Sequence, residues 1–145
     1  MNHDAMILYP LFAMMLLVMI VVTLLWLLRR KAISSKAISI EFYRSYTADQ
    51  GSDEPEYNKV VSRHYSNLFE MPVLFYVVVL LCYVTQQVTS WMVWLSWGYV
   101  AARYVHSYVH LTRNNVVLRF LVFVVSSLIL LSMWIGLLVM LLQTG

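Results

Sequence analysis

Charged residues are scarce in this chain: Asp, Glu, Lys and Arg make up 12% of its 145 residues, whereas 61% are hydrophobic. A soluble domain of this length carries about twice that charged fraction, so the composition excludes an ordinary soluble protein. Glycine, proline and cysteine are also rare, at four, three and one residues. The single cysteine, Cys82, excludes a disulfide framework within the chain. We therefore expect one domain, residues 1–145, that lies in a bilayer.

Three long intervals contain no charged residue, at 5–28, 71–102 and 120–145. The middle interval is too long for one span of about 20 residues, and the polar stretch 86–90 divides it. The expected fold class is therefore all-α. It is a polytopic membrane protein, a bundle of four transmembrane helices at about 6–28, 60–85, 91–111 and 116–142.

The basic residues predict how these helices are oriented. All ten Lys and Arg residues fall on or near one side of the predicted bundle, and both termini fall on the other side. The positive-inside rule then places the loop 29–58 and the turn 112–116 in the cytoplasm, with both termini on the non-cytoplasmic side. The formal net charge of +3 accordingly reflects topology, and nucleic acid is not an expected partner. The short connections are compatible with a bacterial inner membrane.

Polar residues cluster where the second apolar run begins. Arg63, Asn67 and Glu70 are spaced i, i+4, i+7, so on one continuous helix they project within roughly 60° of one another. The apolar run from Met71 to Val84 contains only 14 residues, which is too few to cross about 30 Å of hydrocarbon. A helix that spans the membrane here must therefore bring these polar groups to the membrane boundary. Pro72 is expected to add a small kink beside Glu70.

The third and fourth helices bring more polar groups to the same depth. Arg103, His106 and His110 are spaced i, i+3, i+7 and share one face, and Arg119 opens the fourth helix. Ionisable groups within a span normally face the bundle interior or a wet cavity. The sequence therefore predicts a polar pocket that opens to the cytoplasm.

The residues alone leave a structural reading of this cluster open. Arg63 or Arg103 with Glu70 can form a buried ion pair that fixes helix register, and Asn67 can bridge two helices. A metal site is not expected, because no HExxH pattern exists and the arginines repel cations.

The motif Arg63-x-x-x-Asn67-x-x-Glu70-x-Pro72-x-x-Phe75, followed by Arg103-x-x-His106 and by Arg119, resembles the MAPEG family, the membrane-associated proteins of eicosanoid and glutathione metabolism. The match covers roughly residues 57–142. The resemblance implies a helical bundle that assembles as a homotrimer, with glutathione bound between subunits at the cytoplasmic end.

The resemblance also implies roles for single residues. It assigns glutathione binding to the second-helix Arg63, Asn67 and Glu70 and to the third-helix Arg103 and His106, and it makes Arg119 the catalytic residue that supports the thiolate. His110, one turn beyond His106, belongs to the same predicted binding set and stands where catalytic members usually carry tyrosine. The expected activity is a glutathione-dependent transferase or peroxidase acting on lipophilic electrophiles. The alternative is a non-catalytic protein of the same fold that binds a lipid or stabilises an assembly.

Overall fold

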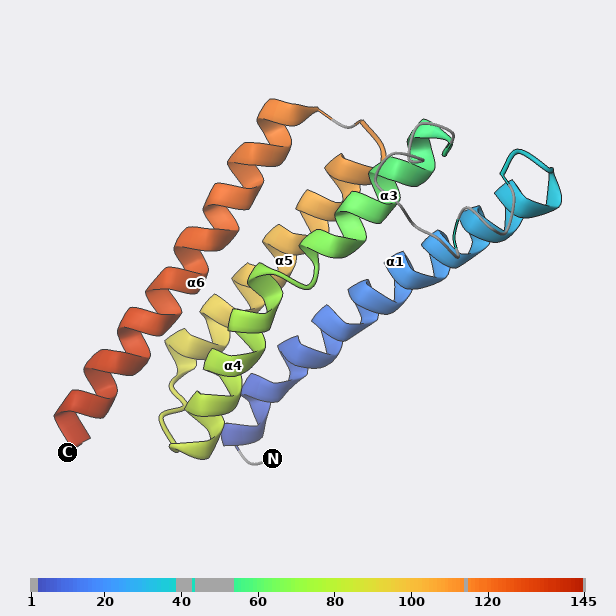
Figure 1. Cartoon of the computed structure of the whole chain (residues 1–145). Helices are drawn as coiled ribbons and strands as arrows, with labels where there is room; N and C mark the ends of the chain where they lie inside the picture. The colour runs from blue at the N-terminus through green and yellow to red at the C-terminus, as the bar shows by residue number, and fades with distance from the viewer. Residues whose placement is uncertain (1–2, 39–42, 44–53, 114, 145) are drawn as a thin grey trace.

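The computed structural model describes residues 3–38, 43, 54–113 and 115–144. Within these residues the regular structure is entirely helical. In chain order the elements are η1 (His3–Leu8), α1 (Tyr9–Ser34), α3 (Glu56–Asn67), α4 (Met71–Val84), α5 (Ser90–Leu111) and α6 (Val116–Thr144) (Figure 1).

The helices form a bundle in which α3, α4 and α5 lie between α1 on one side and α6 on the other (Figure 1). Both termini lie at one end of the bundle. The buried core comes from all the long helices and includes Met14, Phe75, Tyr99 and Met133. A hydrogen bond from the Tyr104 hydroxyl to the Ala13 carbonyl oxygen, at 2.8 Å, ties α5 to α1.

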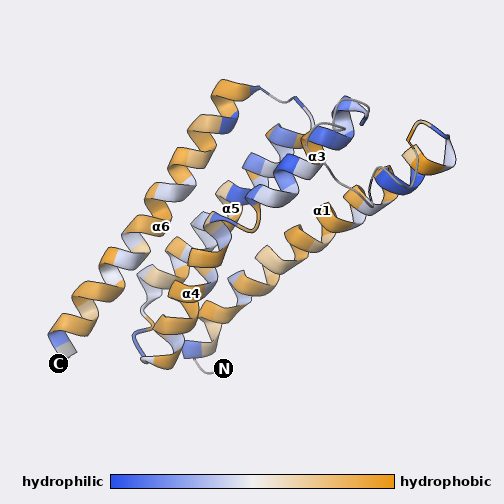
Figure 2. Cartoon of the chain, viewed as in Figure 1, coloured by the Kyte–Doolittle hydropathy of each residue, from blue (hydrophilic) through white to orange (hydrophobic). Residues whose placement is uncertain are grey.

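In the described part of the chain, three segments are long and apolar enough to cross a membrane: Asp4–Ser34, Glu56–Val84 and Val116–Gln143. Hydrophobic residues extend along α1, α4 and α6, whereas hydrophilic residues gather on α3 and the neighbouring part of α5 (Figure 2). Helix α5 has 22 residues, which is long enough to span, but it carries Arg103, His106 and His110 and is not among the segments that are apolar enough. The described residues therefore contain three candidate spans, and the fourth crossing expected at 91–111 stays a prediction.

The loop predicted at 29–58 is shorter in the structure, chiefly at its first end. Helix α1 continues through the basic residues to Ser34, and α3 begins at Glu56. The basic residues after Leu28 end the hydrophobic pattern but not the helix, because Arg and Lys are good helix formers. The Arg29 guanidinium donates to the Ser62 hydroxyl at 3.4 Å and so joins this extension to α3. Residues 39–42 and 44–53 of the loop lie outside the described part of the chain.

The predicted continuous helix 60–85 is also wrong, because the chain breaks between α3 and α4 at residues 68–70. Around the break the backbone N–H groups of Phe69 and Glu70 bond to carbonyls three residues earlier, at 2.9 and 3.4 Å. Pro72 has no N–H to offer the Leu68 carbonyl, and its ring crowds that carbonyl. Proline is well suited to the first turn of a new helix, which is where α4 places it. The expected small kink is thus a complete interruption.

The polar turn expected at 86–90 is present. Helix α4 ends at Val84 and α5 begins at Ser90. Gln86 takes a positive φ of 57°, and the Thr89 hydroxyl caps α5 by accepting from the Met92 N–H at 3.4 Å.

Helix α6 packs closely on α5 at Gly136, which gives a test of the packing. A Cβ added to Gly136 would overlap the ring of Trp91, whereas one added to Gly98 would meet only Ile129 Cδ1 at 3.8 Å. We expect Gly136→Ala to lower the free energy of unfolding by about 1–3 kcal/mol, because the indole must move. Gly98→Ala is the matched control and should be neutral or stabilising, since alanine favours helix. Thermal unfolding in detergent measures both, and equal melting temperatures for the two variants would contradict the packing.

Candidate functional site

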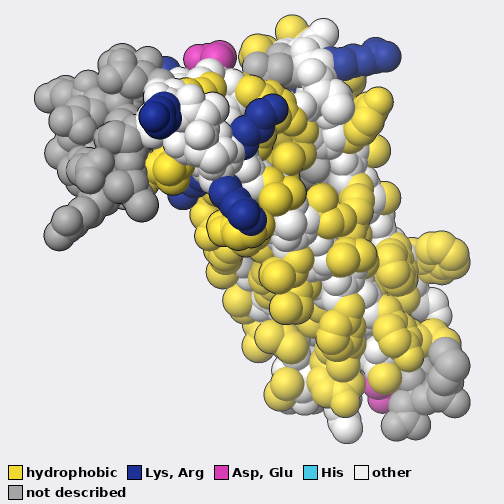
Figure 3. Space-filling model, turned by 90° about the vertical axis from the view of Figure 1, so that its right-hand side faces the viewer, with side chains coloured by type: hydrophobic (Ala, Val, Ile, Leu, Met, Phe, Trp, Pro, Cys, Tyr) yellow, Lys and Arg dark blue, Asp and Glu magenta, His cyan; other side chains and the backbone are white. Residues whose placement is uncertain are grey.

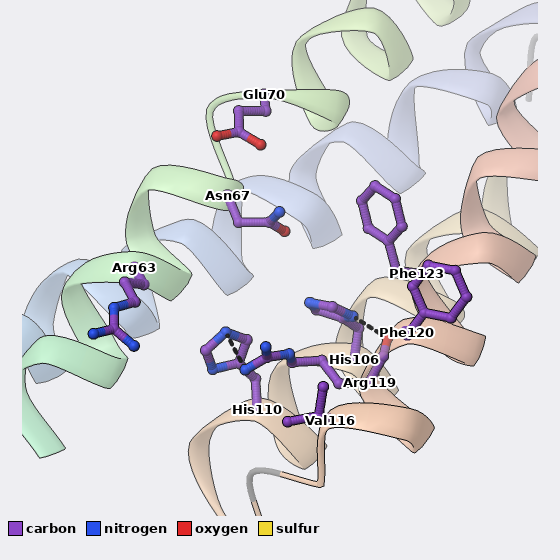
Figure 4. Close-up of a pocket in the computed structure, with 9 residues that line it drawn as sticks. All are labelled: Arg63, Asn67, Glu70, His106, His110, Val116, Arg119, Phe120 and Phe123. Carbon is purple, nitrogen blue, oxygen red and sulfur yellow. Dashed lines mark hydrogen bonds between the residues drawn. The ribbon is translucent and has the colours of Figure 1, made fainter. Parts of the chain in front are cut away.

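A polar pocket of about 390 Å³ lies between α3, α5 and α6. Its volume is in the range of small-molecule sites. Most of the predicted site residues line it: Arg63, Asn67, Glu70, His106, His110 and Arg119 (Figure 4). The structure thus brings together side chains from three helices that the sequence placed at one depth.

One wall of the pocket comes from α3 and the break after it. Arg63 and Asn67 lie on α3, and Glu70 lies in the break, so Glu70 does not continue the α3 face as the i, i+4, i+7 spacing predicted (Figure 4). All three still line the same pocket. Arg63 and Glu70 are exposed, and among the described residues no direct ion pair joins Glu70 to Arg63, although the Glu70 charge acts on Arg103 at longer range. Both charges are therefore available to a ligand.

Arg103 is not among the residues that line the pocket, and its role in glutathione binding stays a prediction. Its side chain is 0% exposed, and its Nη2 donates to the Asn67 side-chain oxygen at 2.6 Å. Arg103 Nε and Nη1 have no hydrogen-bond partner among the described residues. The bond occupies the Asn67 oxygen, so Asn67 is left with its amide N–H donors for the pocket. The bond connects α5 to the end of α3, as expected if Asn67 bridges two helices.

The opposite wall is built around Arg119, which two histidines of α5 contact. His106 Nδ1 lies 3.2 Å from the Arg119 carbonyl oxygen, and Arg119 Nη1 lies 3.3 Å from His110 Nε2 (Figure 4). His106 and His110 are buried, and Arg119 is half-buried. Residues on α5 thus fix both the backbone and the guanidinium of Arg119.

A third histidine lies behind this wall and was not predicted to take part. His64 is 0% exposed, and its Nε2 lies 2.9 Å from the Ser107 hydroxyl. Its ring centroid is 4.8 Å from that of His110 and 5.8 Å from that of His106. The position of His64 in the sequence could have indicated this role. His64 follows Arg63 directly, so its side chain faces α5 when that of Arg63 faces the pocket.

Three apolar residues of α6 complete the pocket and were also missed. Val116, Phe120 and Phe123 line it beside Arg119. Their spacing of i, i+4, i+7 puts them on the same helix face as Arg119. The helical periodicity around Arg119 could therefore have predicted them. They give the polar pocket one hydrophobic side.

Metal-binding geometry is not found among the described residues. No group of three or more His, Cys, Asp or Glu side chains in this part of the chain is arranged to hold a metal ion. The three histidines are engaged by a hydroxyl, a carbonyl and a guanidinium.

The basic side chains visible in Figure 3 gather at one end of the molecule, and hydrophobic side chains cover the rest of that face. A family model described as the MAPEG family matches residues 7–139. The chain belongs to the MAPEG family. Its apolar helices and this membership make it an integral membrane protein. No curated protein and no solved structure matches the chain in the other two comparisons.

Proposed function

We propose that this MAPEG protein is a glutathione-dependent transferase or peroxidase that acts on lipophilic electrophiles. The observation that carries the proposal is Arg119 at the wall of a ligand-sized pocket, where His110 contacts its guanidinium and His106 contacts its backbone carbonyl oxygen. A guanidinium fixed in this way is suited to stabilise an anion that forms beside it.

The opposite wall supports glutathione as the ligand. The tripeptide carries two carboxylates, an ammonium group and two amides. Arg63 offers a fork-shaped donor for a carboxylate, Glu70 offers an acceptor for the ammonium, and Asn67 offers N–H donors for an amide carbonyl or a carboxylate. The charges of the wall therefore complement those of the peptide.

The thiol would then lie toward Arg119. A free thiol has a pKa of about 8.5, so only a few per cent of it is the nucleophilic thiolate at neutral pH. Arg119 stands in the first turn of α6, where the helix dipole adds to its own positive charge. Both effects stabilise the thiolate.

The apolar side of the pocket supports a lipophilic co-substrate. Phe120 and Phe123 line the pocket beside Arg119 and are exposed or half-buried on α6. An apolar molecule dissolved in the bilayer would reach the sulfur along this side. Thiolate attack on its electrophilic carbon would form a conjugate, and attack on a hydroperoxide would begin a reduction.

We further propose a homotrimer with the pocket on the cytoplasmic side, both termini on the other side, and a bacterial inner membrane as its location. The grouping of basic side chains at one end and of both termini at the other supports this topology (Figures 1 and 3). Many large hydrophobic residues are exposed on α1, α4 and α6, which leaves faces for lipid and for neighbouring subunits.

One observation favours the second candidate function, a non-catalytic protein whose pocket binds a lipid or stabilises the assembly. The buried bond between Arg103 and Asn67 connects α5 to the end of α3, so part of the polar cluster is structural. A lipid headgroup phosphate would suit Arg63 and Arg119. The phosphate alone would leave Glu70 without a cationic partner, whereas glutathione supplies an ammonium together with two carboxylates.

Binding variants separate the two functions. We expect Arg63→Ala and Glu70→Gln each to raise the dissociation constant for glutathione about 10-fold or more, because each removes a charge-assisted hydrogen bond. Isothermal titration of glutathione into the detergent-solubilised protein measures the change. Glu56→Gln, in the first turn of α3 and outside the pocket, is the matched control and should bind as the wild type does. Lower melting temperatures with unchanged glutathione affinity would favour the structural role.

A further inference from the structure

His106 presents one of its two ring nitrogens to the pocket. Its Nδ1 lies 3.2 Å from the backbone carbonyl oxygen of Arg119. The other nitrogen, Nε2, points away from that carbonyl toward the space between the two walls of the pocket (Figure 4). No group among the described residues forms a hydrogen bond with Nε2. The Phe123 ring packs against the imidazole, with centroids 6.1 Å apart, and helps to hold this orientation.

The contact with the carbonyl determines which nitrogen of neutral His106 carries the hydrogen. A carbonyl oxygen only accepts hydrogen bonds, so Nδ1 must be the donor. Nε2 of the neutral ring then has a lone pair that faces the pocket, and a lone pair of this kind can take a proton from a bound ligand.

The two neighbouring histidines are less suited to take that proton. A guanidinium only donates, so Arg119 occupies the lone pair on His110 Nε2. His64 does not line the pocket, and its Nε2 lies against the Ser107 hydroxyl. Of the three clustered histidines, His106 is therefore the one whose free lone pair meets the pocket.

We propose that His106 is a catalytic residue that accepts the thiol proton of bound glutathione at Nε2. The inference rests on the proposed function, which places the thiol toward Arg119, and it assigns the thiol proton to a second side chain. The S–H bond breaks, its electron pair stays on sulfur, and the proton forms the second N–H bond of an imidazolium. Nδ1 continues to donate to the Arg119 carbonyl oxygen, and two cations then stabilise the thiolate.

Charged and titratable groups surround His106 on each helix that packs against it. They are His64 on α3, Arg103 and His110 on α5, and Arg119 on α6. Glu70 lies on the far wall of the same pocket. Because the arginines are permanent cations, an imidazolium at His106 requires an anion beside it. The thiolate formed by the same transfer is that anion, so the net charge of the site does not change.

The transfer predicts how many protons leave the protein when glutathione binds. At neutral pH all but a few per cent of free glutathione carries its thiol hydrogen. If Arg119 alone stabilised the thiolate, binding would release about one proton to the solvent for each thiolate formed. If His106 takes the proton, the thiolate forms with almost no release.

The test measures thiolate ultraviolet absorbance and proton release on the same detergent-solubilised, full-length protein. Isothermal titrations of glutathione in two buffers of different ionisation enthalpy give the number of protons released. We expect close to none from the wild type. His106→Asn keeps an N–H near the position of Nδ1 but cannot take a proton, so it should form less thiolate and release about one proton for each thiolate.

His64→Gln is the matched control, because it removes a neighbouring histidine outside the pocket and should release as few protons as the wild type. Release of about one proton per thiolate by the wild type would overturn the inference and leave the proposed function intact. If the wild type formed no thiolate at any pH, the proposed function and the proton transfer would both fall.

Nitrogen-15 NMR of the histidine side chains gives a second readout. In the unliganded protein, neutral His106 should carry its hydrogen on Nδ1, and a hydrogen on Nε2 would overturn the inference by itself. With glutathione bound, both nitrogens of His106 should be protonated, which a purely structural role would not produce. A bound thiolate beside a neutral His106 would also overturn the inference.

Discussion

Arg119→Ala is expected to lower the rate of glutathione conjugation about 10- to 30-fold at neutral pH. The factor follows from the thiol: at a pKa of about 8.5 a few per cent is thiolate, and a shift of about two units downward makes most of it thiolate. The variant loses that shift because alanine carries no charge at the position where Arg119 meets His110. Steady-state rates with a water-soluble electrophile measure the loss.

Two features distinguish loss of activation from loss of structure. The deficit of Arg119→Ala should shrink as the pH rises above about 9, where the thiol ionises without help. Arg113→Ala removes another arginine near the start of α6 that does not line the pocket, and it should keep the wild-type rate. A deficit that stays constant with pH, or one that Arg113→Ala shares, would mean that Arg119 does not activate the thiol.

Arg103→Met is expected to lower glutathione affinity about 10-fold while leaving the melting temperature unchanged or higher. Arg103 is fully buried with two donor nitrogens that lack partners among the described residues, so methionine removes the cost of a desolvated charge, and this gain offsets the lost bond to the Asn67 oxygen. The affinity falls because Asn67 loses the bond that leaves its N–H donors to the pocket. Calorimetric titration and thermal unfolding of the same samples give both quantities.

A double-mutant cycle with Asn67→Ala isolates this route. If Arg103 acts through Asn67, the double variant should bind glutathione no more weakly than the weaker single variant. Fully additive losses would show that Arg103 affects binding independently of Asn67. A large drop in the melting temperature of Arg103→Met alone would show that the buried charge is needed for the fold.

Much of the fold could be predicted from charge-free intervals, because a helix that crosses lipid must be long and apolar. The C-terminal end of α4 and both ends of α5 and α6 were predicted to within about two residues. The rule failed at α1, where Arg29 and Arg30 continue a helix that composition ended. It also failed at Pro72. A proline can cause a mild kink or a full break, depending on the conformation of the preceding backbone, and the spacing of residues does not reveal that conformation.

The sequence predicted which helix faces carry the pocket residues, but it did not predict which side chains contact one another. Polar residues that recur every turn identified the pocket residues on α3, α5 and α6. The spacing could not show that Arg103 lies beneath Asn67 instead of beside it, because the relative rotation of two helices depends on their packing. Nor could it show that His106 and His110 both contact Arg119, since that contact depends on the turn between α5 and α6.

The central claim is that the pocket binds glutathione as a thiolate. The most direct measurement is a titration of glutathione into the purified, detergent-solubilised protein at neutral pH, followed by thiolate ultraviolet absorbance. The account predicts a saturable thiolate signal in the wild type that Arg119→Ala lacks. No binding at millimolar glutathione would contradict it and would leave the pocket to another ligand or to assembly.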